Sequence, residues 1–256
     1  MIKTNSLLAK LAKRFPKKYA MEYHDHVGLM VGKLPQQVQK IYLALDFESM
    51  LLDEVQAFKP DLIITHHPFL FGTRSYIRKN DPLKEALARD LERLGLVVYS
   101  FHTNFDRGDG GMNDALAEAL ELTEIRPLHS DPMARGGRLP HPMAPEEVAR
   151  YAKKQLKTSF GLLLPYGRPL VETIAIIGGG GAKYFTNALE DNYDMFISGD
   201  APHHVRRRII NARYNYLDLP HEIESLFLEQ MEKILLSIDG SLEIKKAPHQ
   251  VEAQVI

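Results

Sequence analysis

The sequence predicts an α/β fold made of two α/β units, and two regularities support this prediction. Short runs of branched and aromatic apolar residues alternate along the chain with segments that repeat apolar residues at helical spacing. Most of the short runs are apolar at nearly every position, as expected of strands covered on both faces. Alternation of this kind is typical of α/β folds with largely parallel sheets. The 256 residues suffice for one large domain or two modest ones.

The predicted elements are distributed over the whole chain. Strands are expected at residues 41–45, 61–65, 96–101, 173–177, 194–198 and 214–217. Helices are expected at residues 47–58, 82–94, 112–122, 145–156, 183–190, 202–212 and 221–238. Residues 126–144, with four prolines and a Gly-Gly pair, are predicted as a linker or a crossing between subdomains. We therefore expect a first domain formed by residues 1–125 and 214–256 and a second formed by residues 126–213.

Composition excludes several kinds of chemistry. The chain has no cysteine, so disulfides, thiol nucleophiles and Cys-ligated metal sites are excluded. A metal site must therefore use nitrogen and oxygen ligands, which the 11 histidines and 33 acidic residues can supply. The net charge of −1 gives no global attraction to nucleic acid or to an anionic membrane. No apolar run approaches the ~20 residues that a membrane-spanning helix needs, and we expect a cytoplasmic protein.

Two basic segments each have two interpretations. The first 21 residues contain Lys and Arg but no acid; the spacing of Leu7, Leu8 and Leu11 favours an amphipathic helix of the fold over an organellar presequence. The run Arg206–Arg208 with Arg213 favours a solvated surface over a phosphate-binding patch.

Polar and glycine residues follow nearly every predicted strand. In open α/β sheets, ligands bind beyond the carboxyl ends of strands, where loops bring distant side chains together. A site formed of His and Asp side chains is therefore expected at these positions. The residues concerned are Asp46, His66, His67, His102, Gly178–Gly181, Asp200 and His221.

Each candidate ligand has a structural interpretation beside the functional one. His66 and His67 end a strand, where the turning backbone lets both rings face one cavity, although a histidine pair is more often a hydrogen-bonded structural feature. Asp106 precedes a glycine-rich turn, so it is either a turn cap or a carboxylate ligand. His102 is a candidate for orienting a ligand through its second nitrogen.

The segment from Pro220 to Glu224 and the run Gly178–Gly181 also carry candidate chemistry. On a helix His221 and Glu224 share a face, so they can converge on one ion; an acid in the first turn of the helix is the structural alternative for Glu224. Gly178–Gly181 lacks the Walker and dinucleotide patterns and predicts a tight strand-to-helix turn, with anion binding as the alternative.

Six motifs occur in the order found in one known family. The chain resembles the dinuclear-metal-centre proteins called GTP cyclohydrolase I type 2 homologues, or the Nif-three-like family. The motifs are HDHVGLMVG at 24–32, DLIITHHPFLF at 61–71, YSFHTNFDRGDGGMNDALAEAL at 99–120, IIGGGGAKYF at 176–185, ISGDAPHH at 197–204 and HEIESLF at 221–227.

The resemblance implies a site for two divalent ions (Zn, Fe, Mn, Co or Ni) in the cleft between two α/β units. It also implies a ring-shaped homo-oligomer, commonly a hexamer. The implied metal ligands are His66, His67, Asp106, His221 and Glu224, with Glu224 as the bridging carboxylate, and most of them lie in the first predicted domain. Asp46, His102, Asp200 and His204 fall on other motif positions that line the cleft.

The chain departs from the family pattern at two places. Pro220 stands where the last motif usually has Gly, and the first motif reads His24-Asp25-His26 in place of an aromatic-Asp-Asn start. The spacing from His221 to Glu224 is retained, and the two extra histidines are expected at the rim of the site.

Two functions follow as alternatives. The first is a metal-dependent hydrolase acting on a small nucleotide-like or phosphorylated substrate, with His102 or His204 as proton carrier or substrate contact. The cyclohydrolase mechanism does not transfer with the name, because authentic GTP cyclohydrolase I uses a cysteine ligand. The second is a non-catalytic metal-binding scaffold, metal chaperone or regulatory protein whose ring binds protein or, less expectedly, nucleic acid.

Overall fold

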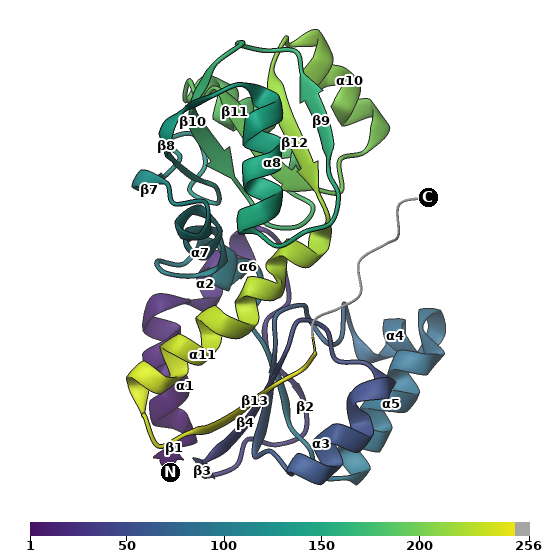
Figure 1. Cartoon of the computed structure of the whole chain (residues 1–256). Coiled ribbons are helices and arrows are strands. Elements are labelled where there is room, and N and C mark those ends of the chain that lie inside the picture. Colours follow the sequence, from purple (N-terminus) through teal and green to yellow (C-terminus); the bar gives the residue numbers. More distant parts are fainter. Residues whose placement is uncertain (249–256) are drawn as a thin grey trace. The chain divides into compact units, whose positions relative to one another are not determined.

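The computed structural model describes residues 1–248, which divide into two α/β units. Among the described residues, unit 1 comprises 1–109 and 227–248, and unit 2 comprises Gly110–Leu226. Each unit contains a mixed sheet with helices packed on it, and Figure 1 labels the elements. The predicted α/β class is therefore confirmed.

The unit boundaries differ from the expected domain boundaries. Residues 110–125 and 214–226, expected in the first domain, lie in unit 2. The reason is strand pairing: β12 (Asn215–Leu219) lies between β11 (Met195–Gly199) and β9 (Leu162–Pro165) in the sheet of unit 2. Residues 249–256 of the expected first domain lie outside the described residues.

The sheet of unit 1 has the strand order β13-β4-β5-β6-β2 and is parallel except for β2. Its central strands β4 and β5 are almost entirely apolar and buried, as the sequence predicts for strands covered on both faces. A separate two-stranded antiparallel ladder joins β1 and β3. The strands are β1 (Ile2–Lys3), β2 (Gly28–Val31), β3 (Gln37–Val38), β4 (Lys40–Ala44), β5 (Leu62–Thr65), β6 (Val98–Ser100) and β13 (Glu243–Lys246).

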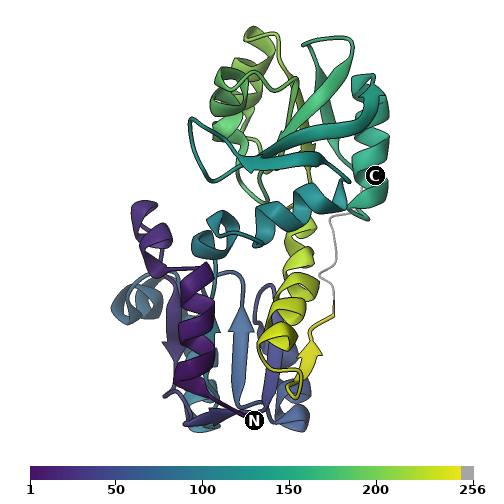
Figure 2. The same ribbon diagram turned by 90° about the vertical axis from the view of Figure 1, so that its left-hand side faces the viewer.

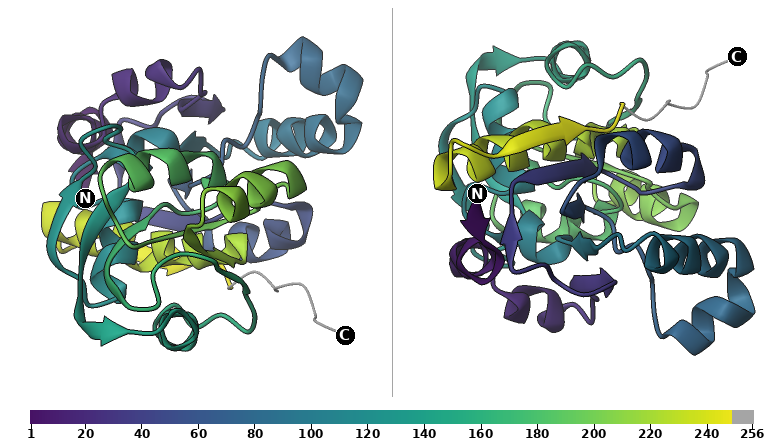
Figure 3. Two further views of the ribbon diagram at one scale, coloured as in Figure 1. Left: turned by 90° about the horizontal axis from the view of Figure 1, so that it is seen from above. Right: turned by 90° about the horizontal axis from the view of Figure 1, so that it is seen from below.

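Helices cover both faces of this sheet. Figure 2 shows α1 and α11 in front of it, and the views of Figure 3 show α4 and α5 side by side. Leu7 and Leu11 of α1 are fully buried, so the amphipathic segment near the start of the chain belongs to the fold. The helices are α1 (Thr4–Arg14), α2 (Lys17–Glu22), 3-10 helix η1 (Ser49–Leu51), α3 (Leu52–Phe58), α4 (Arg74–Asn80), α5 (Pro82–Arg93), α6 (Thr103–Arg107) and α11 (Leu226–Ile238).

The sheet of unit 2 has the order β7-β8-β10-β11-β12-β9. Only β10, β11 and β12 are parallel; β7, β8 and β9 are antiparallel to their neighbours. In Figures 1 and 2, α8 lies on one face and α9 and α10 lie on the other. The other helices and strands of unit 2 are α7 (Met112–Ala119), β7 (Thr123–Pro127), β8 (Arg135–Met143), α8 (Pro145–Gln155), β10 (Val171–Ile176), η2 (Ala182–Tyr184), α9 (Phe185–Glu190), α10 (His203–Asn211) and η3 (His221–Ser225).

The segment predicted as a linker or a crossing contains the nine-residue strand β8, so the linker interpretation is wrong. β8 pairs with both β7 and β10, and each pairing contains a register shift. The Gly-Gly pair is not a turn, because Gly136 and Gly137 lie where other groups approach the backbone closely. A Cβ at Gly136 would meet the ring of Tyr193 at 2.0 Å, and one at Gly137 would meet the carbonyl oxygen of Thr123 at 2.8 Å.

Gly137→Ala is expected to destabilise the protein by about 1–3 kcal/mol, because the new methyl overlaps a backbone atom of the paired strand, which cannot rotate away. The urea midpoint of unfolding measures the loss. Gly240→Ala is the matched control, because its Cβ would meet only the Leu236 carbonyl oxygen, at 3.8 Å. Equal losses in the two variants would contradict the steric explanation.

Candidate metal centre

Three histidines of unit 1 form a cluster at the carboxyl ends of two neighbouring parallel strands. His66 and His67 follow β5, and His102 follows β6, which pairs with β5 in parallel. One ring nitrogen from each of the three lies within 4.8 Å of the others. The sequence placed all three at strand ends, and the parallel register explains why they meet: parallel strands carry their following loops to the same edge.

Each ring of this cluster is held through Nδ1 by an oxygen. Nδ1 of His66 donates to the Phe101 carbonyl (2.9 Å), Nδ1 of His67 to Asp46 Oδ2 (2.8 Å) and Nδ1 of His102 to Asp25 Oδ2 (2.7 Å). An imidazole that donates from Nδ1 carries its lone pair on Nε2. Metal-ligating histidines characteristically have this arrangement, because the oxygen fixes both the tautomer and the ring orientation.

Asp25 belongs to the candidate site and was missed by sequence reasoning, since the first motif drew attention to the histidines beside it. Burial alone would raise the pKa of Asp25, but the hydrogen bond from His102 and the charge interaction with that ring, together with hydrogen bonds from the Thr103 side chain and the His26 peptide N–H, lower the pKa to about 2. Asp25 is therefore an anion at neutral pH and orients His102. The only sign of Asp25 in the sequence was its position between two histidines, His24 and His26.

Asp106 supplies a carboxylate beside the cluster. It lies in α6, and its Oδ1 is 3.4 Å from Nε2 of His66. Two ligand atoms that each lie about 2.1 Å from one ion, at angles of about 90–110°, are about 3.0–3.4 Å apart. The separation therefore suits two ligands of one cation.

The ring of His66 is fully buried, with the rings of Phe227 and Phe105 at centroid distances of 5.1 and 6.2 Å.

In unit 2, His221 and Glu224 converge as their spacing predicts. They lie in the 3-10 helix η3, where residues three apart are eclipsed, and His221 Nε2 is 3.0 Å from Glu224 Oε2. Nδ1 of His221 donates to Asp200 Oδ2 at 2.5 Å. The pair thus repeats the arrangement of unit 1: an oxygen holds Nδ1, and Nε2 lies beside a buried carboxylate.

The glycine run after β10 packs against this pair. As predicted, it forms a tight strand-to-helix turn that leads into η2. A Cβ at Gly178 would lie 2.8 Å from Glu224 Oε1; one at Gly179 would lie 2.7 Å from the same atom and 3.0 Å from His221 Nε2. Gly179 also has φ +54°, a conformation that side chains disfavour. Glycine is therefore needed here for the close approach of the backbone to His221 and Glu224.

The remaining histidines singled out from the motifs and the basic run Arg206–Arg208 lie outside these groups. His204 is exposed near the start of α10, and His24 and His26 are exposed before β2. None of the three belongs to a candidate metal-binding group within the described part of the chain. Arg206 pairs with Asp218 at 2.8 Å, whereas Arg207 and Arg208 are exposed.

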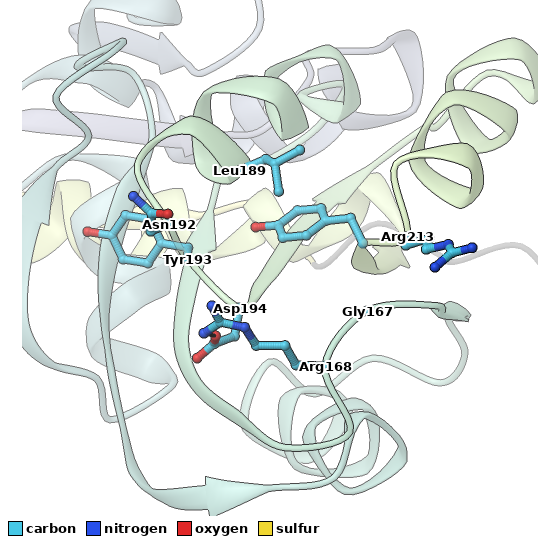
Figure 4. Close-up of a pocket in the computed structure, with 8 residues that line it drawn as sticks. Gly167, Arg168, Leu189, Asn192, Tyr193, Asp194 and Arg213 are labelled. Carbon is cyan, nitrogen blue, oxygen red and sulfur yellow. Dashed lines mark hydrogen bonds and ion pairs between the residues drawn. The ribbon is translucent and has the colours of Figure 1, made fainter.

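A separate pocket lies near the amino ends of β11 and β12, at the strand ends opposite to Gly178 and Asp200. Its volume is about 110 Å³. Figure 4 shows the guanidinium group of Arg168 against Asp194 and the side chain of Arg213 directed away from both. The positively charged groups of Arg168 and Arg213 do not point toward one another, so they do not form an anion-binding site in this pocket.

These features define a two-unit α/β protein with candidate metal-binding groups of histidine and carboxylate side chains. A family model described as Duf34/NIF3 (NGG1p interacting factor 3) matches residues 2–252. The chain belongs to this family, which confirms the resemblance inferred from the six motifs.

Named relatives and solved structures agree with this assignment. A Lactococcus lactis protein named GTP cyclohydrolase 1 type 2 homolog is 33% identical over 252 residues, covering 95% of each chain. A Clostridium perfringens protein of the same name is 31% identical over 231 residues, covering 87% of each chain. The structure of a Bacillus cereus protein related to NIF3 matches with a TM-score of 0.88 at 18% identity over 99% of both chains. Reduced HcgD from Methanocaldococcus jannaschii matches with a TM-score of 0.79 at 26% identity over 96% of this chain and 97% of that one.

No helix within residues 1–248 is both long enough and apolar enough to cross a membrane.

Proposed function

We propose that the chain binds divalent metal ions through His66, His67, Asp106, His221 and Glu224 and acts as a metal-dependent hydrolase. One observation carries the proposal: each of the three histidines in this set has its Nδ1 held by an oxygen, so that Nε2 carries the lone pair that binds a cation. The donors are nitrogen and carboxylate oxygen only, which suits Zn, Mn, Fe, Co or Ni.

A bound divalent ion would supply an acidified water and polarise the substrate. The chain's own residues supply the rest. Asp106 and Glu224 bring negative charge that offsets the charge of a cation, while Asp46, Asp25 and Asp200 hold the imidazoles in place. His102 is partly exposed and paired with Asp25, as expected of a group that moves a proton at Nε2. We assign proton transfer to His102 and not to His204, which lies outside the candidate groups.

The substrate we propose is small and nucleotide-like or phosphorylated. The relatives' shared name, GTP cyclohydrolase 1 type 2 homolog, supports this class. Hydrolysis of such a substrate would form a bond from a water oxygen to a phosphoryl phosphorus or a ring carbon and break the bond from that centre to a leaving oxygen or nitrogen, which would take up a proton.

Metal analysis of the purified protein tests the ligand assignment. We expect about two ions per chain in the wild type, by analogy with two-metal hydrolases, and fewer in His67→Ala and His221→Ala. Hydrolysis of p-nitrophenyl phosphate and of GTP by the metal-loaded protein is expected to fall by at least about 100-fold in His67→Ala and Glu224→Ala. His141→Ala, which removes an exposed histidine of β8, is the control. Metal below one ion per chain would refute the ligand set, and unchanged hydrolysis in the ligand variants would favour the non-catalytic scaffold.

A further inference from the structure

Phe71 is a large apolar side chain that the fold holds in solvent. Its exposed fraction is 62%, whereas Phe69 and Leu70 before it are buried. These two neighbours anchor the segment in the core of unit 1, where both belong to one apolar cluster. Gly72, with φ +116°, turns the chain directly after it. The exposure of Phe71 is therefore imposed by a fixed backbone on both sides.

The exposed ring lies beside the histidine cluster. The centroids of the Phe71 and His102 rings are 6.4 Å apart, and the ring planes are at 76°. His102 and His67 are themselves partly exposed, with side-chain exposed fractions of 23% and 19%. Phe71 and the open sides of these two histidines consequently border the same stretch of surface.

The exposed ring of Phe71 can bind another planar ring by stacking. A phenyl ring offers a rigid apolar surface with a negative face, on which other planar rings stack in offset geometry. Such stacking accepts any base, because every base has a π-face. A substrate that reacts beside His102 would place its flat part on Phe71 while its reacting group faces the histidines.

We propose that Phe71 is a stacking platform for a planar heteroaromatic ring of the substrate. This inference rests on the proposed function and narrows it, since it requires a ring-bearing substrate such as a nucleotide and disfavours simple sugar phosphates. It assigns Phe71 to substrate binding, with no part in holding the metal.

The absence of tryptophan from the chain permits a direct test. Phe71→Trp places a single tryptophan at the platform, and its fluorescence in the metal-loaded full chain reports stacking. The probes are adenosine 5′-monophosphate and ribose 5-phosphate, which differ by the planar ring. We expect saturable quenching by the nucleotide only. Leu83→Trp, at an exposed site in α5, is the control and should show no saturable quenching.

Calorimetric titration of adenosine 5′-monophosphate gives a second measurement. Phe71→Ala is expected to weaken binding about tenfold, with Phe71→Tyr close to the wild type. Leu83→Ala, whose side chain is 83% exposed, should bind as the wild type does.

Equal quenching of the Phe71→Trp variant by both probes, or equal affinity in Phe71→Ala and wild type, would overturn the inference. So would a change of oligomeric state in Phe71→Ala with nucleotide affinity retained. Elemental analysis of each sample separates this inference from the proposed function. Loaded metal without ring-selective binding refutes the platform alone, and ring-selective binding without metal refutes the hydrolase alone.

Discussion

Chelation of the bound metal is expected to lower the thermal unfolding midpoint of the wild-type protein by roughly 8–16 °C. A ligand that binds only the folded state at about 1,000 times its Kd stabilises that state by about 4 kcal/mol. Each kcal/mol shifts the midpoint of a chain of this size by about 2–4 °C. The candidate ligands of unit 1 lie in the loop after β5 and in α6, which bound metal would hold together. Thermal scans with and without EDTA measure the shift.

The His67→Ala variant tests whether the EDTA-dependent shift of the unfolding midpoint comes from metal bound at the histidine cluster of unit 1. Its side chain is partly exposed and bonds Asp46, so the substitution leaves a small cavity and should preserve the fold of the EDTA-treated protein. In this variant EDTA should shift the midpoint clearly less than in the wild type. His141→Ala should keep the full shift. An EDTA effect of wild-type size in His67→Ala would show that the stabilising metal binds elsewhere.

Gly179→Ala is expected to reduce metal affinity about 10–100-fold, the range seen when the groups that orient metal ligands are disturbed. The added Cβ would lie 2.7 Å from Glu224 Oε1 and 3.0 Å from His221 Nε2, both closer than atoms pack. The positive φ adds strain of about 1–2 kcal/mol. His221 or Glu224 must therefore move, and their 3.0 Å pairing should be lost.

The neighbouring glycine supplies the control for this substitution. A Cβ at Gly180 meets no atom within 4 Å, so Gly180→Ala should bind metal as the wild type does. Metal titration followed by competition with a chromogenic chelator measures both variants. Equal affinity of Gly179→Ala and wild type would mean that His221 and Glu224 do not hold the ion.

Local sequence patterns were sufficient to predict many of the helices and strands. The six predicted strands correspond to β4, β5, β6, β10, β11 and β12, and each predicted helix is present with small shifts at its ends. Such segments are readable because their apolar periodicity extends over a whole element. Strands β8 and β9 were missed because their composition reads as loop: β8 contains Pro140, Pro142 and the Gly-Gly pair, and β9 is a short, partly exposed run at the edge of its sheet.

The sequence by itself determined the α/β class, the absence of cysteine chemistry and the candidate ligands at strand ends. These follow from periodicity, composition and short spacing, which are properties of neighbouring residues. The tertiary structure alone decided which oxygen holds each histidine. Asp25 is 77 residues from His102, and Asp200 is 21 from His221. It also decided that Gly137 allows strands to pair and that Gly179 allows the backbone to approach His221. Contacts between residues far apart in the chain depend on strand register and loop geometry, which no local pattern encodes.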